Sequence, residues 1–486
     1  MRAAAEVRLR YRPHTPYTDT PVTEEHVPRV RFGKATATLL ALAVMVGAIL
    51  AGCSARSPVP DQSETPLPES FTATGQSERP QPWWRHFNDR ALDQVVSRVL
   101  DDNFSLAAAR ERLNRARAAA RRAAGGERPA VDGEAEASSQ TDYRAGAMAA
   151  YEVDLWGRLN ARTEAAEVEA DATRRDLQAA RISLTAEAAR TYYGLRREKA
   201  LAALLREQRA TNRRILDLVD LRYRNGQART DELLRQRQLI EDTETRLAEV
   251  RGEINRLRAE LAALQGLPGP RALELPDAGG LPELAPRPET GLPAEWLQRR
   301  PDLEAAYLRV QAADAELAAA IAERYPSLDL TASLETVASS PADLFQTWIE
   351  EIAASLSVPL FRGGRIEAEI DRTRAARAEA FNEYAQTVLD AVAGVETALA
   401  DERSERDRLA SLERRVNQGE EVLERLRFRY QQGDTAFVDV LRAQDELQND
   451  QRERLVAQWN LVTARVTLLR ELAGAWPPPE SKRPSS

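Results

Sequence analysis

Few side chains in this sequence have the types and spacing needed for covalent or metal chemistry. The 486 residues contain one cysteine, Cys53, so neither an internal disulfide nor a cysteine-based metal site can form. His86 is the only histidine beyond that cysteine, which removes the commonest metal sites and nucleophile–base pairs. We therefore predict a protein that is not an enzyme and holds no metal and no cofactor, with His86 as a packing or surface residue. A formal net charge of −8 also argues against nucleic acid as a partner.

Cys53 is the one residue whose surroundings indicate a covalent modification. It follows an apolar run over residues 35–52, and basic residues precede that run. A basic flank, an apolar core and small residues before a break are typical of a secretory signal. The last four residues, from Leu50 to Cys53, resemble the bacterial lipobox, in which the cysteine is acylated and becomes the first residue of the mature chain. An apolar run of this length could also cross a bilayer as an anchor, but the lipobox favours the lipoprotein.

The flanks of Cys53 predict where the chain goes and how it is attached. Residues 1–52 are interpreted as an N-terminal extension and a lipoprotein signal peptide. Lipoproteins kept in the inner membrane typically carry Asp after the cysteine, so Ser54 implies export to the outer membrane. Residues 53–82 are rich in Pro, Ser and Glu and predict a flexible tether.

The second half of the sequence repeats the first, so the predicted elements of the two halves can be aligned in pairs. Gly157 and Gly226 recur as Gly364 and Gly433, both 207 residues later. Landmarks nearer the start of each half are only 197 residues apart, and this slip indicates loops of different length. We predict two structural repeats, over residues 83–266 and 297–475, joined by an inter-repeat linker over 267–296 and followed by a disordered tail over 476–486.

Each repeat is predicted to contain a first helix and then two very long helices. Gly and Pro are nearly absent from residues 158–225 and 365–432, and helices of that length would be roughly 100 Å long. The returning helices, over about 230–265 and 437–474, carry apolar residues at alternating steps of three and four, which is coiled-coil spacing. Helices this long must pack side by side, and their periodicity alone would also suit a fibrous or scaffold coiled coil.

Between the first helix and the long helices, each repeat has a predicted β-hairpin, at about 129–156 and 326–359. Apolar and polar residues alternate there over about 10 residues, the length that a tilted strand needs to cross a bilayer. A single such hairpin would fit a soluble half-buried sheet better. Four strands cannot close a barrel, and open edges are not tolerated in lipid, so several chains must share one barrel.

The polar faces of these strands are expected to line a water-filled lumen. We predict no basic residue on those faces, unless a loop arginine such as Arg144 folds inward. Rings of carboxylates would then favour cations in the pore. The seven predicted lumen acids are Asp132, Glu134, Glu136, Glu152, Asp154, Asp329 and Glu335.

Four stretches of the sequence carry a resemblance to a known family. They are Trp83 to Asp89 with Leu92, Tyr151 to Leu159, Gly291 to Asp302, and Val358 to Arg365. The second and fourth lie at strand-to-helix transitions, and the third lies between the repeats. Together they resemble the outer-membrane efflux protein family, the TolC-like channels, and most closely its lipidated branch, over about residues 83 to 475.

The resemblance implies an α+β membrane protein in the cell outer membrane. Three protomers would each give four strands to one 12-stranded β-barrel, continued by a long α-helical periplasmic tunnel with a small equatorial domain. The implied function is the passive exit duct of a tripartite efflux system for drugs or other small toxic compounds. The implied partners are two further copies of the chain, a periplasmic adaptor, an inner-membrane RND-type transporter and outer-membrane lipid, with a covalent lipid on Cys53.

The resemblance also assigns roles at the far end of the long helices, where each repeat has a Tyr-x-x-Gly turn. Tyr430 and Asp439 match residues that hold the family's periplasmic aperture closed, and Asp231 is the equivalent acid of the first repeat. Thr435 and Arg442 depart from the pattern of the drug-and-protein exporters, so the closed-state contacts are expected to differ. The two acids could equally be helix N-terminal residues that stabilise the helix dipole. The exposed turn residues are expected to contact the adaptor: Asn225, Gly226, Gln227, Gln432, Gly433 and Asp434.

Two other classes of protein fit part of the sequence. A periplasmic coiled-coil adaptor lipoprotein would also be lipidated, but adaptors have one helical hairpin and this chain has two, with strand pairs between them. A scaffold coiled coil would leave the strands unexplained. The sequence does not name the cargo, and scarce Met and His give no sign of a relay for soft metals.

Overall fold

The structure is a computed structural model that describes residues 70–74, 82–138, 143–275, 280–290 and 299–472. By its internal contacts the chain divides into two units, Met1–Pro66 and Leu67–Ser486, and every described residue belongs to the second. Cys53, the predicted signal segment, the predicted tail and part of the inter-repeat segment therefore lie outside the described residues.

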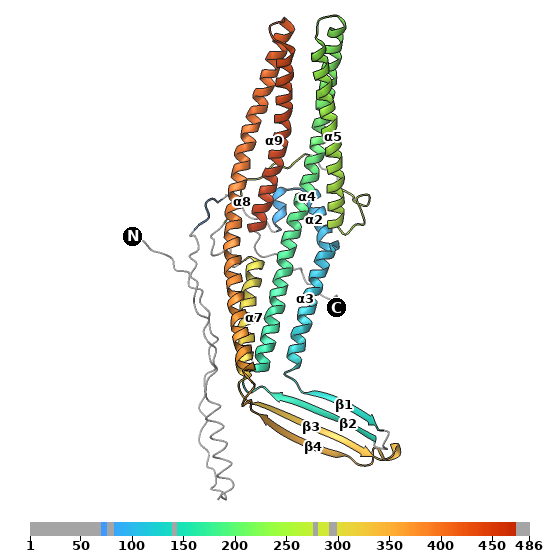
Figure 1. Cartoon of the computed structure of the whole chain (residues 1–486), viewed down its shortest axis with the longest axis vertical. Coiled ribbons are helices and arrows are strands. Elements are labelled where there is room, and N and C mark those ends of the chain that lie inside the picture. Colours follow the sequence, from blue (N-terminus) through green and yellow to red (C-terminus); the bar gives the residue numbers. More distant parts are fainter. Residues whose placement is uncertain (1–69, 75–81, 139–142, 276–279, 291–298, 473–486) are drawn as a thin grey trace, which may run out of the picture. The chain divides into compact units, whose positions relative to one another are not determined.

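The long helices form two antiparallel hairpins (Figure 1). In the first repeat, α4 (Arg158–Arg224) returns as α5 (Thr230–Leu264), and in the second, α8 (Arg365–Gln432) returns as α9 (Phe437–Leu472). α4 and α8 have 67 and 68 residues, so each is roughly 100 Å long. Apolar contacts join the two helices of each hairpin, and α4 also packs on α9, which ties the hairpins together. No helix within the described residues is long and apolar enough to cross a membrane.

The four strands form one antiparallel sheet in the order β1-β2-β3-β4, with bounds Ala130–Ala137, Tyr143–Val153, Ser327–Ala338 and Ile349–Ser357. A short 3-10 helix, η2 (Pro341–Asp343), lies between β3 and β4. Each strand pair follows a helix: α3 (Phe104–Gly125) precedes β1, and α7 (Pro301–Ala322) precedes β3. α4 packs between α3 and α7, and α7 packs against α8, so α3 and α8 flank this layer of four helices (Figure 1).

Both very long helices begin directly after a glycine in the left-handed region. Gly157 has a φ of 72° and Gly364 a φ of 78°, which L side chains rarely adopt. Trp156 fixes the first corner, because its indole Nε1 donates to the Pro326 carbonyl at 2.8 Å. Its ring also stacks on Tyr325, with centroids 4.8 Å apart. Since these two partners lie between α7 and β3, the contact joins the repeats at the end of the sheet.

The sequence predicts one first helix in repeat 1, and the structure shows two. α2 (Arg90–Asp102) ends and α3 begins at Asn103, whose side-chain oxygen accepts from the Leu106 amide at 3.0 Å and caps α3. The Asn103 side-chain amide donates to the Leu264 carbonyl at 2.9 Å, at the end of α5. One buried side chain thus starts one helix and satisfies the end of another.

The largest apolar core lies where η1 (Trp83–Phe87) and α2 pack on α4, α5 and α9. The Phe87 ring lies 5.3 Å from the Tyr193 ring of α4, and the Trp83 indole donates to Thr185 Oγ1 at 3.2 Å. The tryptophan-rich segment singled out in the sequence is therefore a packing element that fastens η1 and α2 to three long helices.

Residues 53–82 are predicted to be a flexible tether, and residues 70–74 correct that prediction. The Phe71 side chain is buried in an apolar cluster formed by α7, α8 and α9. Beside it, the Thr72 amide donates to a carboxylate oxygen of Glu396 at 2.9 Å. A Pro- and Ser-rich composition predicts flexibility on average, but one aromatic side chain with a fitting apolar site is enough to dock a short segment.

Candidate functional site

The strand register shows that the sheet has one acidic face. In an antiparallel pair, directly opposite residues point to the same side. Glu134 stands opposite Gly146, which stands opposite Glu335, and Glu152 stands opposite Asp329. Because side chains alternate along each strand, these pairs put six of the seven predicted acids on one face: Asp132, Glu134, Glu136, Glu152, Asp329 and Glu335.

The structure corrects the predicted composition of that acidic face in two places. Arg144 was assigned to a loop, but it lies on β2 opposite Glu136, so the face does carry a basic residue. Glu351 on β4 stands opposite Ser333 and adds a carboxylate that the alternation did not identify. The alternation failed there because Glu350, its neighbour, lies on the apolar side and breaks the pattern.

Two of the predicted lumen acids have partners at the start of α4. Glu152 pairs with the Arg158 guanidinium at 2.5 Å. Asp154 lies beyond the end of β2, and its Oδ2 accepts from the Asn160 amide at 2.9 Å, which satisfies a free donor in the first turn of α4. Seven carboxylates on the strands, set against the guanidiniums of Arg144 and Arg158, leave the acidic face with a net charge of −5 per protomer.

The opposite face of the sheet is apolar and exposed. Its exposed large side chains are Val131, Leu330, Leu334, Ile352 and Leu356, with exposed fractions from 38% to 89%. In the described chain, β1 and β4 each pair with a single strand, so both edges of the sheet have free backbone groups. A sheet of this kind needs an apolar medium on one side and neighbouring strands at its edges.

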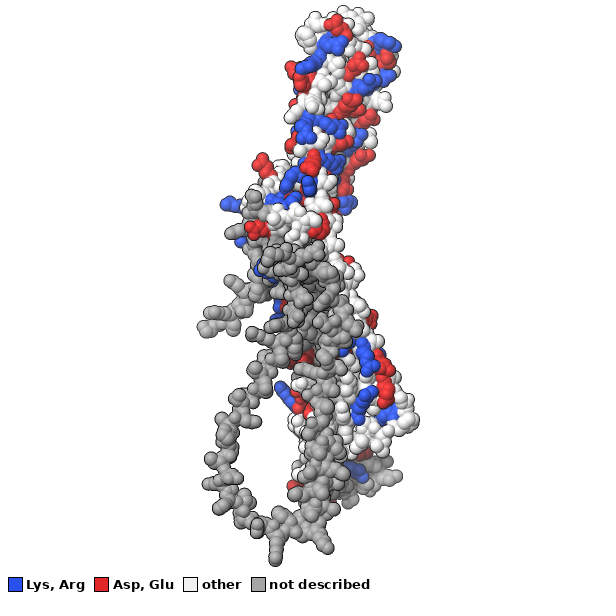
Figure 2. All heavy atoms as spheres, turned by 90° about the vertical axis from the view of Figure 1, so that its left-hand side faces the viewer, with Lys and Arg blue, Asp and Glu red and all other residues white. Residues whose placement is uncertain are grey.

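The turns between the long helices are tight, and each contains a glycine in the left-handed region. Gly226 has a φ of 71° and Gly433 a φ of 81°. All six residues predicted to contact an adaptor are exposed there: Asn225, Gly226, Gln227, Gln432, Gly433 and Asp434. Figure 2 shows acidic and basic side chains interspersed over this end of the helices, so a partner would meet a mixed rather than a one-sign surface.

Tyr430 joins the two hairpins close to these turns. Its ring lies 5.2 Å from the Phe437 ring, and the Arg222 guanidinium carbon lies 4.5 Å from its centroid. Arg222 belongs to α4 and Tyr430 to α8, so this cation–π contact crosses between the repeats. Burial raises the pKa of Tyr430 above its ordinary value, and the positive charge of Arg222 partly opposes that shift. Arg222 could not be assigned from the sequence, because no local pattern connects it to Tyr430, which lies in the other repeat.

The two predicted aperture acids lie at the starts of the returning helices. Thr435 Oγ1 donates to Asp439 Oδ2 at 3.0 Å, and Arg229 Nε lies 3.0 Å from Asp231 Oδ1. Thr435, one of the two departures from the family pattern, thus binds Asp439 within its own chain. The other departure, Arg442, is exposed. Among the described residues no hydrogen bond joins Asp439 to Tyr430. Within one protomer Asp439 contacts Thr435, and Tyr430 contacts Phe437.

A buried amide cluster joins the hairpins further along the helices. Gln448 of α9 donates to the Asn212 side-chain oxygen at 2.9 Å, and Gln236 of α5 donates to the Asn212 carbonyl at 2.7 Å. These three residues are buried, and Asn212 lies on α4. Buried amides need specific partners, so the cluster fixes how α4, α5 and α9 are aligned.

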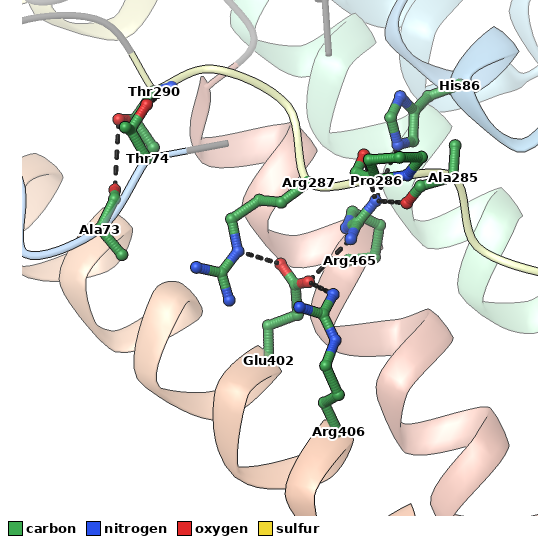
Figure 3. A network of polar contacts seen from close by, with 10 residues as sticks. All are labelled: Ala73, Thr74, His86, Ala285, Pro286, Arg287, Thr290, Glu402, Arg406 and Arg465. Atoms are coloured by element: carbon green, nitrogen blue, oxygen red, sulfur yellow. Dashed lines mark hydrogen bonds and ion pairs between the residues drawn. The ribbon is translucent and has the colours of Figure 1, made fainter. Parts of the chain in front are cut away.

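An ion network that no sequence pattern predicts joins the two helices of the second hairpin (Figure 3). Glu402 of α8 and Arg465 of α9 are both fully buried and pair at 2.7 Å. The same carboxylate also accepts from Arg406 at 2.7 Å and lies 3.4 Å from Arg287 Nε, which comes from the inter-repeat segment. Such a pair stabilises the fold only while every charge in it has a partner.

Arg465 connects this network to η1 and to the inter-repeat segment. Its guanidinium donates to the Ala285 carbonyl at 2.8 Å and to His86 Nε2 at 2.8 Å (Figure 3). Because arginine can only donate, His86 accepts through Nε2 and is neutral, with its proton on Nδ1. Burial and the nearby Arg465 lower the pKa of His86 below 6.5, although Glu402 opposes this. His86 is therefore a buried hydrogen-bonding residue rather than a surface residue.

Acidification is expected to weaken this network through His86. A histidine whose pKa is lower in the folded chain leaves stability unchanged above the unfolded value of 6.5, and stability is lost as pH falls below it. The loss is at most about 1.4 kcal/mol per pH unit and protomer. Heat-induced unfolding of the wild type and of His86→Gln should be compared between pH 7.5 and 5.5. Equal pH dependence of the two proteins would contradict this expectation, because it would mean that His86 binds protons equally well in the folded and the unfolded chain.

The two-faced sheet, its unpaired edges and the long helices that leave it define a subunit of an outer-membrane channel. Residues 95–267 and 292–475 match the family model described as outer membrane efflux protein. The pyoverdine export outer membrane protein OpmQ of Pseudomonas putida is 30% identical over 423 residues, which cover 82% of this chain and 88% of OpmQ. The chain belongs to the outer membrane efflux protein family.

Two further comparisons agree with this assignment. The cation efflux system protein CusC of Escherichia coli is 25% identical over 89% of this chain and 97% of its own. The solved structure of the outer-membrane channel OprN matches with a TM-score of 0.79 at 25% identity, covering 86% of this chain and all of OprN. The chain is thus an outer-membrane channel of a tripartite efflux system, with a four-stranded sheet and a periplasmic helical tunnel.

Proposed function

We propose that three copies of this chain form the passive exit duct for small molecules that a periplasmic adaptor and an inner-membrane RND-type transporter deliver. The observation that carries the proposal is the sheet, whose acidic face suits water and whose apolar face suits lipid. Antiparallel pairing of β4 with β1 of the next copy would satisfy both free edges. The acidic faces of all copies would then line one bore.

The adaptor is proposed to dock on the turns between the long helices. Those turns combine glycine-fixed backbones with exposed amide and acid side chains, and they lie at the opposite end of α4 and α8 from the sheet. The Tyr430–Arg222 contact lies close behind them, so a partner that displaces the turns can act on the link between the hairpins. The duct itself would carry no catalytic step.

The cargo is proposed to be drugs or other small toxic compounds. OpmQ is named for pyoverdine export and CusC for cation efflux, so channels similar to this chain serve chemically different cargo. A bore lined by carboxylates with a net negative charge would admit cationic and neutral compounds more readily than anions. Ion selectivity in a planar bilayer tests this proposal.

Cys53 is proposed to carry a covalent lipid that anchors the chain. The proposal is supported by the Leu50–Cys53 tetrad after an apolar run. Replacement by alanine, Cys53→Ala, is expected to abolish incorporation of labelled palmitate, because the chain has no other cysteine. The measurement is fatty-acid labelling of the purified protein, with Ser54→Ala as the control that should stay labelled. Continued labelling of Cys53→Ala would overturn the assignment.

A further inference from the structure

The ends of the sheet determine which helices of two neighbouring copies meet. β1 and β4 are the edge strands, α3 leads directly into β1, and α8 follows directly after β4. When β4 of one copy pairs with β1 of the next, α8 of the first copy must come beside α3 of the second, and the two run in opposite directions. This step rests on the proposed assembly of three copies around one bore.

α3 is strongly basic and has an outer stripe that its own chain leaves uncovered. Its 22 residues include six arginines and one glutamate. The side chains of Leu106 and Leu113 face α4, where they pack on Leu177. The residues on the opposite side recur at steps of four and three and are all exposed: Phe104, Ala108, Glu111, Arg115, Ala118 and Arg122. Among the described residues, neither arginine of this stripe has an ion-pair partner.

α8 carries the complementary charge on its own outer stripe. Ile366 and Ile370 face α7, and the exposed stripe opposite to them is formed by Ala375, Glu379, Asn382, Gln386 and Leu389. Two other carboxylates on this part of α8 pair within the chain, Glu369 with Arg372 and Asp371 with Arg374. In the described part of the chain Glu379 has no such partner, so its carboxylate is available to a second copy.

The spacing of the two stripes matches in the antiparallel direction. Along α3, Phe104 lies eleven residues further from the sheet than Arg115. Along α8, Leu389 lies ten residues further from the sheet than Glu379. The two spacings are therefore within one helical residue, or about 1.5 Å, of each other. Phe104 is 75% exposed and Leu389 is 45% exposed, whereas Leu106 and Leu113 on α3 and Ile366 and Ile370 on α8 are buried.

The geometry points to a recognition seam between copies, in which α3 of one chain and α8 of the next pair Arg115 with Glu379 and Phe104 with Leu389. In this register Ala118 faces Ala375, where two small side chains allow the helices to approach closely, and Ala108 leaves room for Gln386. The seam sets the axial register of the copies. It also selects a second copy of this chain over a related channel subunit, because a mismatched copy would leave Arg115 facing no acid.

Cysteine cross-linking tests the seam directly. In one chain α3 and α8 are separated by α4 and α7, whereas a disulfide needs Cα atoms within about 7 Å, so any link must join two copies. Arg115→Cys combined with Glu379→Cys is expected to give a ladder of covalent dimers and trimers after oxidation and denaturation. Each single variant controls for links through Cys53, and Arg115→Cys with Arg374→Cys, on another side of α8, should stay monomeric on the same gel.

A charge exchange provides a second measurement. Arg115→Glu and Glu379→Arg, each alone, are expected to lower the assembly constant about five-fold per seam, and the double variant should restore it. Two results would overturn the seam while leaving the channel intact. One is a cross-link in the variant with Arg115→Cys and Arg374→Cys, and the other is a trimer of the variant with Arg115→Cys and Glu379→Cys that forms no covalent link. A wild-type protein that forms no trimer by native mass measurement would instead contradict the proposed assembly itself.

Discussion

Replacing Glu402 with leucine is expected to lower the free energy of unfolding by about 3–5 kcal/mol per protomer, because the change leaves the fully buried Arg465 without its carboxylate. Arg465 would keep its contacts with His86 and the Ala285 carbonyl, but neither carries a negative charge. Arg406 and Arg287 would lose the same partner. Since a membrane trimer unfolds irreversibly, the loss is measured as faster heat-induced unfolding by circular dichroism.

Two variants separate the buried network from a general effect of removing charge. Glu421→Leu removes an exposed carboxylate that pairs with Arg425 one helical turn away, and the expected loss is below about 0.5 kcal/mol. Glu402→Leu with Arg465→Met removes both buried charges and should be more stable than Glu402→Leu alone. A double variant that is less stable than the single one would mean that Arg465 acts mainly through His86 and the carbonyls.

The second large effect is expected at the turns, where Tyr430→Ala combined with Asp439→Ala should shift the channel towards its open state. Loss of the ring removes the contact with Arg222, and such contacts contribute about 0.5–1 kcal/mol at exposed sites. If three protomers open together, about 1 kcal/mol from each adds to about 3 kcal/mol, or roughly 150-fold in the open-to-closed ratio. Single-channel recording should show higher conductance or a greater open fraction.

Matched variants identify which contact closes the channel. Tyr430→Phe keeps the ring over which Arg222 lies, so it should record like the wild type. Arg222→Ala removes the same contact from the other side and should open the channel as Tyr430→Ala does. If the double variant at Tyr430 and Asp439 conducts like the wild type, the gate lies elsewhere.

Elements whose conformation depends on residues close by in the sequence could be predicted from the sequence. Gly157, Gly364 and Gly433 mark where long helices begin or end because the left-handed backbone they adopt is a local requirement. Alternation along the strands placed Glu134 and Glu335 on one face, since side-chain direction in a strand follows from position alone. The fold class and the acidic face were therefore predictable with little knowledge of distant contacts.

Contacts between distant segments were not predictable in the same way. Arg465 pairs with Glu402, 63 residues away, and with His86, 379 residues away, and no spacing rule connects them. Arg222 and Tyr430 come from different repeats, so their pairing appears only once the hairpins are packed. Phe71 docks within a stretch whose composition suggests flexibility, because burial of one ring depends on a site that other segments build.

Copies of this chain are proposed to enclose a water-filled bore lined by the acidic face of the sheet. The most direct measurement is the reversal potential of purified protein across a planar bilayer in a KCl gradient. We expect a cation preference at 0.1 M salt that fades at 1 M, as the Debye length falls from about 10 Å to about 3 Å.

Variants on the strands refine that measurement. Glu134→Gln with Glu335→Gln should weaken the cation preference, and Arg144→Gln should strengthen it, because Arg144 lies on the same face. Glu350→Gln, on the apolar face, should leave the preference unchanged. An anion-selective or neutral wild-type pore at low salt would contradict the proposed channel, since it would mean that the acidic face does not line the conducting path.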